Sequence, residues 1–164
     1  LTQLHRDLHE TVFKNGGKYE EFNEGMDLSI SIVYHNEKMI NFAGAMNDLY
    51  LIRNNEIFMY RGSRHSIGTN VSISGEEDQF VYESQTIECQ DGDMFYMFSD
   101  GFVDQFGGPE QKKFKHRRFK QMLLNIHKLP DKDQRMILNQ KHNEWKQHNE
   151  QTDDISVIGF EPWA

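Results

Sequence analysis

The feature that most constrains this fold is an apolar run at residues 94–98, which ends in Ser99-Asp100-Gly101. The run follows a turn signal at Asp91-Gly92, and a run of this length is typical of a strand buried on both faces. Asp100 would then lie at the tip of the strand, where Gly101 lets the chain turn sharply. This position suits a catalytic or metal-binding acid, but it also suits an ordinary turn, so the remaining sequence has to decide.

The remaining pattern predicts a mixed α+β domain. Leucines at helical spacing predict a first helix from Leu1 to Val12, ended by Asn15-Gly16-Gly17. Alternating residues and turn signals predict strands at residues 28–34, 38–43, 49–53, 56–60, 80–83 and 86–89, before the run at 94–98. A short helix or turn at 102–106, helices at 114–126 and 131–148, and a strand at 155–160 complete the pattern. Hairpins followed by helices and a last strand are typical of an α+β domain or layered sandwich.

Composition excludes several classes of protein. The net charge of −8 over 164 residues argues against a general nucleic-acid binder. It suits carboxylates gathered around divalent cations, although a solvated acidic surface gives the same total. The single cysteine, Cys89, falls in an alternating run and is interpreted as a reduced core residue. No apolar run approaches the roughly 18 residues of a membrane span and no signal peptide is visible, so a cytoplasmic location is the default expectation.

A second acidic motif gives Asp100 a possible partner. Asp153 and Asp154 precede the last predicted strand, as Asp100 follows the buried one. If these two strands pair antiparallel, the three carboxylates meet at one edge of the sheet, where they repel unless cations neutralise them. Ligands that are all oxygen favour Mg²⁺ or Mn²⁺ over zinc. The alternative is a pair of ordinary acid-rich turns, which often flank strands.

Several segments together resemble one protein family. The motifs are SDGFVDQFGG at residues 99–108, TDDI at 152–155, FAGA at 42–45 followed by LYLIR at 49–53, and a glycine loop at 61–68 with Ser66 where proline is usual. In these motifs the chain resembles the C-terminal part of serine phosphatases related to stage II sporulation protein E. These proteins form the bacterial branch of the type 2C metal-dependent protein phosphatases. The two acidic motifs, in order and each beside its strand, carry most of the resemblance.

The resemblance implies a fold, a chemistry and a set of site residues. The fold is an antiparallel β-sandwich flanked by helices, with two Mn²⁺ or Mg²⁺ ions at one end. Asp100 and Asp153 correspond to catalytic metal ligands, while Gly101 and Asp154 belong to the same metal site and Asp154 orients it. The implied reaction is hydrolysis of a phosphoserine or phosphothreonine protein by metal-activated water, as part of signal transduction. The residues that bind the substrate remain unknown.

One family motif has no counterpart in this sequence. The early acidic residue followed by D-x-x-G-H-G is absent, and the helix that begins at Leu1 resembles the one that normally follows it. We therefore expect residues 1–164 to be a single partial domain, the C-terminal portion of a phosphatase domain whose N-terminal strands are missing. We also expect an upstream regulatory or sensor domain in the parent, and weak or no turnover by the fragment. The alternatives are a non-catalytic partner-binding module with a degenerate phosphatase fold and a simple divalent-cation-binding domain.

Four further features have both a functional and an ordinary interpretation. Asp27 could approach the metals or be a solvated strand-entry acid, and Asp104 could support the site or be a helix-start charge. His5 and His9, four residues apart, could bind a metal, but exposed histidines are favoured. A basic cluster could steer an acidic or phosphorylated partner or be a solvated helix face. It consists of Lys112, Lys113, Lys115, Arg117, Arg118 and Lys120.

Overall fold

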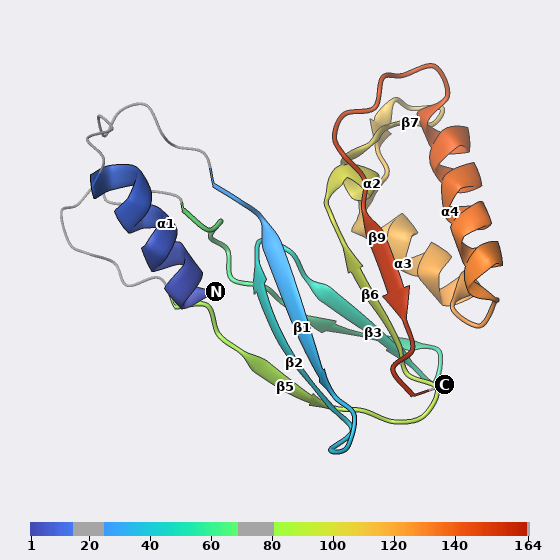
Figure 1. The fold of residues 1–164 in the computed structure, drawn as a ribbon. Helices are drawn as coiled ribbons and strands as arrows, with labels where there is room; N and C mark the ends of the chain where they lie inside the picture. Colours follow the sequence, from blue (N-terminus) through green and yellow to red (C-terminus); the bar gives the residue numbers. More distant parts are fainter. Residues whose placement is uncertain (15–24, 69–80, 164) are drawn as a thin grey trace. The chain divides into compact units, whose positions relative to one another are not determined.

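The computed structural model of the chain describes residues 1–14, 25–68 and 81–163 (Figure 1). The chain divides into two compact units, which are described separately. The first unit comprises Leu1–Leu49 and Tyr60–Cys89, and the second comprises Tyr50–Met59 and Gln90–Ala164. The predicted mixed α+β architecture with antiparallel sheets is confirmed, and each unit contains one main sheet.

The first unit is built around a three-stranded sheet. Its elements are helix α1 (Thr2–Lys14) and strands β1 (Leu28–Tyr34), β2 (Met39–Ala45) and β5 (Gln85–Glu88), in the sheet order β1-β2-β5. Strands β1 and β2 form the predicted hairpin, in register from Leu28 opposite Ala45 to Tyr34 opposite Met39. Strand β2 extends two residues beyond its predicted end, because Gly44 and Ala45 continue the pairing with β1.

Tyr82 explains why one predicted strand in the first unit is wrong. The pattern predicted a strand at 80–83, but residues 81–84 form no strand and residue 80 lies outside the described residues. The Tyr82 backbone N–H donates instead to Thr2 Oγ1 at 3.2 Å, and the tyrosine hydroxyl donates to the Ser66 carbonyl at 2.9 Å. The Tyr82 ring is buried with Ala45 and Ile67, and burial raises the pKa of the phenol. Packing of this side chain therefore replaces strand pairing.

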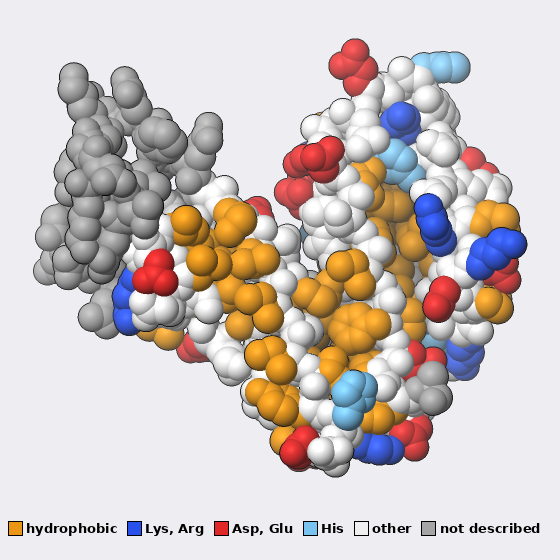
Figure 2. All heavy atoms as spheres, in the orientation of Figure 1, with side chains coloured by type: hydrophobic (Ala, Val, Ile, Leu, Met, Phe, Trp, Pro, Cys, Tyr) orange, Lys and Arg blue, Asp and Glu red, His pale blue; other side chains and the backbone are white. Residues whose placement is uncertain are grey.

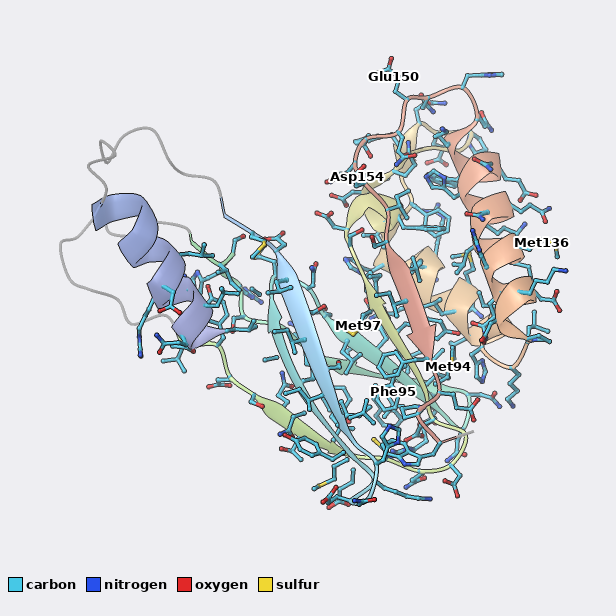
Figure 3. The ribbon with its side chains drawn as sticks, viewed as in Figure 1. Met94, Phe95, Met97, Met136, Glu150 and Asp154 are labelled. Atoms are coloured by element: carbon cyan, nitrogen blue, oxygen red, sulfur yellow. The ribbon has the colours of Figure 1, made fainter. Side chains whose placement is uncertain are left out.

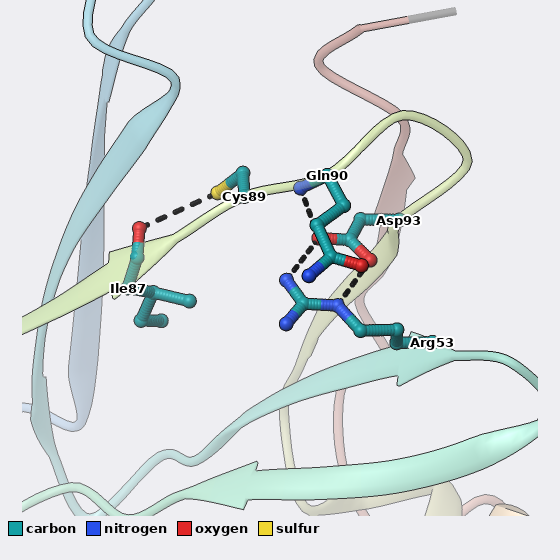
Figure 4. A network of polar contacts seen from close by, with 5 residues as sticks. All are labelled: Arg53, Ile87, Cys89, Gln90 and Asp93. Atoms are coloured by element: carbon teal, nitrogen blue, oxygen red, sulfur yellow. Dashed lines mark hydrogen bonds and ion pairs between the residues drawn. The ribbon is translucent and has the colours of Figure 1, made fainter.

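Cys89 follows β5 and behaves as the sequence predicted. Its thiol is buried, forms no disulfide, and lies 3.4 Å from the Ile87 carbonyl, as Figure 4 shows. The thiol is a weak donor that packs as a small apolar group.

The second unit joins a four-stranded sheet to two long helices. The sheet order is β4-β3-β6-β9, formed by β3 (Leu49–Arg53), β4 (Glu56–Tyr60), β6 (Met94–Phe98) and β9 (Val157–Phe160). Between β6 and β9 lie α2 (Gly101–Asp104), the strand pair β7 (Phe106–Gly107) and β8 (Lys112–Lys113), α3 (Lys115–Ile126) and α4 (Asp131–Lys146). The β7–β8 pair was not predicted, because two-residue strands leave no detectable alternation.

Aromatic side chains form the core of the second unit. The Phe98 ring of β6 lies 4.9 Å from the Phe119 ring of α3, and Phe102 of α2 lies 5.0 Å from the same ring, measured between centroids. Tyr96, also buried, donates its hydroxyl to Gln134 Oε1 of α4 at 2.6 Å. The apolar run of β6 is thus core, as expected, and it fixes α2 and both helices against the sheet.

An ion pair holds the beginning of β6. Asp93, only 1% exposed, accepts hydrogen bonds from Arg53 Nε at 2.8 Å and Arg53 Nη2 at 2.5 Å (Figure 4). The backbone N–H of Gln90 also donates to this carboxylate, at 2.8 Å. A bidentate guanidinium and a backbone donor leave this buried charge well compensated.

Candidate functional site

The candidate site lies where β6 ends and β9 begins. The two strands pair antiparallel with Phe98 opposite Val157, which fulfils the condition under which the two acidic motifs meet at one edge of the sheet. Pairing continues beyond the strands, because Ser99 N–H donates to the Ser156 carbonyl at 3.0 Å. The Ser99 hydroxyl donates to the Asp154 carbonyl at 3.0 Å and accepts from Ser156 N–H at 2.9 Å. Ser99, to which the sequence analysis gave no role, therefore links the two acidic motifs by hydrogen bonds.

Gly101 brings the two motifs into backbone contact. A Cβ atom built on Gly101 would lie 2.4 Å from the Asp154 carbonyl oxygen, closer than real Cβ atoms approach other atoms. The sequence assigned this glycine to a sharp turn, but Gly101 is not among the glycines with positive φ. Glycine is needed at this position because any side chain would collide with the Asp154 carbonyl. Helix α2 begins at Gly101, and the preceding Asp100 makes no side-chain cap hydrogen bond to it.

Three carboxylates reach the surface at this junction. Asp100, Asp153 and Asp154 are all exposed, and Figure 2 shows acidic side chains gathered at this end of the second unit. Asp154 and Glu150 lie in the segment between α4 and β9, at the opposite end of β6 from Met94 (Figure 3). Asp153 Oδ1 accepts the Asp154 backbone N–H at 2.6 Å, which fixes one oxygen of that carboxylate.

The donor set fits a hydrated divalent cation. All the candidate ligands are oxygens, which suit Mg²⁺ or Mn²⁺. Over the described residues, the side chains bring together no group of three or more His, Cys, Asp or Glu able to hold a metal. Mg²⁺ commonly keeps several waters and uses only one or two carboxylates, so Asp100 and Asp153 could hold such an ion together with water.

A cavity in the second unit does not coincide with these acids. It has a volume of about 430 Å³ and lies between the β6–β9 pair and α4, where Phe102, Ile155 and Leu138 form part of its lining. None of the three candidate acids lines it. The three candidate acids are instead exposed at the surface of the unit.

Gln105 is the residue near the site that sequence reasoning missed. It directly follows α2 and is fully buried, and its side chain contacts the segment that leads to Asp153. Its Nε2 donates to the Glu150 carbonyl at 2.9 Å, and its Oε1 accepts the Thr152 N–H at 3.4 Å. The sequence carries no local signal for this role, because the partners of the amide at Glu150 and Thr152 lie 45 and 47 residues away.

The ordinary interpretations fit most of the basic cluster. Lys113 forms an ion pair with Asp104 at 2.7 Å, and Lys112 forms one with Glu110 at 2.6 Å. Asp104, which could have supported the site, is thus engaged by a lysine. It is also the acid in the first turn of the four-residue helix α2, as the helix-start interpretation expected.

Two further cations of the cluster lie over aromatic rings. The Arg118 guanidinium lies 4.6 Å from the Trp145 ring centroid, and Lys120 Nζ lies 5.2 Å from that of Tyr50. These contacts fix α3 against the unit by cation–π attraction. They give no support to a role of Arg118 and Lys120 in steering a partner.

The first-unit candidates also have local partners. His5 is buried, so the expectation of an exposed histidine is wrong for it, because Gly68 N–H donates to His5 Nδ1 at 3.1 Å inside the unit. The side chain of His9 lies outside the described residues. Asp27 accepts a hydrogen bond from the Ser66 hydroxyl. The described residues of this unit contain no cluster able to hold a metal.

Comparison with known families gives the decisive observation. The model of the stage II sporulation protein E (SpoIIE) family matches residues 2–162. The chain belongs to the SpoIIE family. No curated protein sequence matches it. Within the described residues, no helix of this SpoIIE-family chain is long and apolar enough to cross a membrane.

Solved structures agree with this assignment. The SiaA-PP2C domain of Pseudomonas aeruginosa is 24% identical with a TM-score of 0.77, and the match covers 97% of this chain and 68% of that one. The SpoIIE phosphatase domain of Bacillus subtilis, in an Mn-presoaked form, is 15% identical with a TM-score of 0.62, covering 96% and 63%. The serine/threonine phosphatase PstP/Ppp of Mycobacterium tuberculosis is 12% identical with a TM-score of 0.57, covering 94% and 66%. The SpoIIE-family chain therefore has the fold of PP2C-type phosphatase domains and spans about two thirds of each matched chain.

Proposed function

We propose that this chain is part of a metal-dependent serine/threonine protein phosphatase. The observation that carries the proposal is the junction of β6 and β9, where Ser99 and Gly101 hold the Asp100 motif against the Asp153-Asp154 motif. Both motifs keep exposed carboxylates, and the family is one of phosphatases. Asp100 and Asp153 are the proposed metal ligands, with Gly101 and Asp154 completing the site.

The residues of the site have separate tasks in this proposal. Phosphate monoesters are extremely inert, and their hydrolysis can need acceleration by up to about 10²¹-fold. A pair of bound Mn²⁺ or Mg²⁺ ions would supply an activated water and a clamp for the phosphoryl oxygens. Asp100 and Asp153 would hold these ions, and the Asp154 N–H fixes the Asp153 carboxylate. Gly101 allows the start of α2 to approach the Asp154 backbone closely.

The domain and its partners are part of the same proposal. We propose that residues 1–164 form the C-terminal portion of a phosphatase domain, because their motifs resemble those of its C-terminal part. The chain spans 68% and 63% of the first two matched structures, which agrees with a partial domain. The substrate would be a phosphoserine or phosphothreonine protein, which an open acidic surface can admit. An upstream regulatory domain, a cytoplasmic location and weak turnover by residues 1–164 alone remain predictions from the sequence.

Hydrolysis of a phosphoserine peptide tests the proposal. The full-length protein that contains these residues is assayed with and without Mn²⁺, together with an Asp153→Asn variant. Metal-dependent phosphate release is expected, and the variant should lose more than about 100-fold, beyond the usual cost of altering a residue that only supports a ligand. Glu150→Gln is the matched control, because Glu150 is an exposed acid of the same segment. Its activity should stay within about 3-fold of the wild type.

The alternative function is the non-catalytic partner-binding module. Absence of hydrolysis by the full-length protein, with Mn²⁺ present and the fold intact, would overturn the phosphatase proposal and favour this module. Equal losses in Asp153→Asn and Glu150→Gln would overturn the role of Asp153, because they would show only a general charge effect.

A further inference from the structure

Gln105 has an unusually complete set of side-chain hydrogen bonds for a fully buried residue. Its Nε2 donates to the carbonyls of Glu150 at 2.9 Å and Phe106 at 3.0 Å. Its Oε1 faces the Thr152 N–H at 3.4 Å and His142 Nε2 at 3.3 Å. An amide oxygen can only accept, so the contact with His142 is a hydrogen bond in the tautomer that carries a proton on Nε2. All four hydrogen-bonding positions of the amide are used at 0% exposure.

The backbone of Gln105 is anchored independently of these bonds. Its carbonyl accepts the Phe114 N–H at 3.0 Å and the Trp145 indole N–H at 3.0 Å. The first of these donors comes just before α3 and the second from α4. The amide is therefore held by the helical part of the unit, and it reaches from there to the segment between α4 and β9.

The placement of Gln105 links the two acidic motifs. It is the C-cap of α2, the helix that begins immediately after Asp100. Its amide contacts main-chain atoms of Glu150 and Thr152, and Thr152 directly precedes Asp153. We propose that Gln105 is a positioning residue, which holds the Asp153 segment at a fixed place relative to α2 and thereby sets the metal affinity of the site. This inference rests on the proposed metal-dependent function.

The chemistry of the position explains why an amide suits it. One side chain must donate to the Glu150 carbonyl and accept from the Thr152 N–H. A neighbouring strand would offer the same donor and acceptor. A carboxylate cannot donate, and an apolar side chain can do neither. Glu150 and Thr152 are exposed residues, so water can replace the lost partners when the amide is removed. Such a substitution should loosen the segment without unfolding the unit.

The test compares Gln105→Met with Trp145→Phe in the full-length protein. The first change removes the side-chain bonds to the segment at similar volume. The second removes the indole donor to the Gln105 carbonyl and leaves those bonds in place. Binding of Mn²⁺ is measured by electron paramagnetic resonance, and backbone hydrogen exchange is measured over residues 150–156. Gln105→Met should weaken Mn²⁺ binding about 10–100-fold and speed exchange, which is the usual range for residues that orient ligands. Trp145→Phe should lower the melting temperature but keep Mn²⁺ affinity within about 3-fold.

The outcomes separate this inference from the proposed function. If the wild type binds Mn²⁺ and both variants bind equally well, or are weakened equally, the positioning role is overturned while the phosphatase proposal stands. If the wild type neither binds Mn²⁺ nor hydrolyses the peptide, the proposed function and the stated effect on metal affinity both fail. Faster exchange in Gln105→Met alone would then show a purely structural link. His142→Phe removes one donor to the amide and replaces Gln105→Met if that variant does not fold. It should then speed exchange over residues 150–156 more than Trp145→Phe does, and equal exchange in these two variants would overturn the positioning role.

Discussion

The two ends of β6 carry acids in similar sequence settings but in opposite environments. Asp93 directly precedes the strand, is 1% exposed, and pairs with Arg53 and the Gln90 N–H. Asp100 lies two residues beyond the strand, is exposed, and sits beside the exposed acids of the second motif. A glycine adjoins each acid. The difference shows that a position at a strand end does not decide the role of an acid.

What decides the role is the group across the sheet. Arg53 ends β3, the neighbour of β6, and its guanidinium occupies both oxygens of Asp93. On the other side of β6, the neighbour is β9, and the residues before β9 add carboxylates instead of a cation. One end of the strand is thus a closed ion pair, while the other carries exposed acids on both motifs. In the proposed function, a divalent cation there would take the place that Arg53 has beside Asp93.

Asp100→Asn should produce the largest effect of this comparison. Loss of a charged metal ligand should reduce Mn²⁺-dependent hydrolysis by the full-length protein more than about 100-fold. Without metal, the free energy of unfolding should change by less than about 1 kcal/mol, because exposed polar substitutions cost little. Peptide hydrolysis and urea unfolding in the presence of a chelator measure the two quantities. A variant that keeps wild-type turnover would remove Asp100 from the proposed site.

Asp93→Asn should show the reverse pattern. Removing one member of a buried ion pair typically costs about 3–5 kcal/mol, and the partial exposure of Arg53 places this case near about 3 kcal/mol. Urea unfolding should detect this loss. Mn²⁺ affinity of the folded variant should equal that of the wild type, because Asp93 and the candidate site flank β6 at opposite ends. A loss of affinity without a loss of stability would contradict the structural role of Asp93.

The glycines at the two ends of β6 sharpen the comparison further. Gly101→Ala places a Cβ 2.4 Å from the Asp154 carbonyl, so it should cost about 1–3 kcal/mol and also weaken Mn²⁺ binding. Gly92 has a φ of +82° but open space around its Cβ position. Gly92→Ala should therefore cost about 1 kcal/mol through backbone strain and leave Mn²⁺ affinity unchanged. Equal metal affinities in the two variants would refute the close-approach role of Gly101.

The sequence predicted the individual strands better than the contacts between distant segments. The apolar run of β6 and the alternation of β1 identify strands because period and burial are local properties. The antiparallel pairing of β6 with β9 was stated only as the condition for the two acidic motifs to meet, and the structure has this pairing. Ser99 and Gln105 were missed because their partners lie 55 and 45 residues away, at Asp154 and Glu150. No local pattern records such contacts.

The smallest expected effect comes from His142, whose ring contacts the Gln105 amide near the second acidic motif. Burial first, and then the charge of Lys146, lower the pKa of His142 below 6.5. Outside its own helix the ring meets Gln105 and Phe102, neither of which is charged. The unfolded chain therefore binds a proton that the folded protein excludes.

The sign of the pH dependence follows from this difference. Stability is fully present above the unfolded pKa of about 6.5 and falls as the pH drops through the lower folded value. Because the ring is partly exposed, the loss should be under about 1 kcal/mol between pH of about 7.5 and 5. Urea unfolding at several pH values measures it. His142→Gln should remove this share of the slope, and Lys146→Met should remove only part of it, because burial is the larger cause. If His142→Gln keeps the wild-type slope, His142 does not contribute to it.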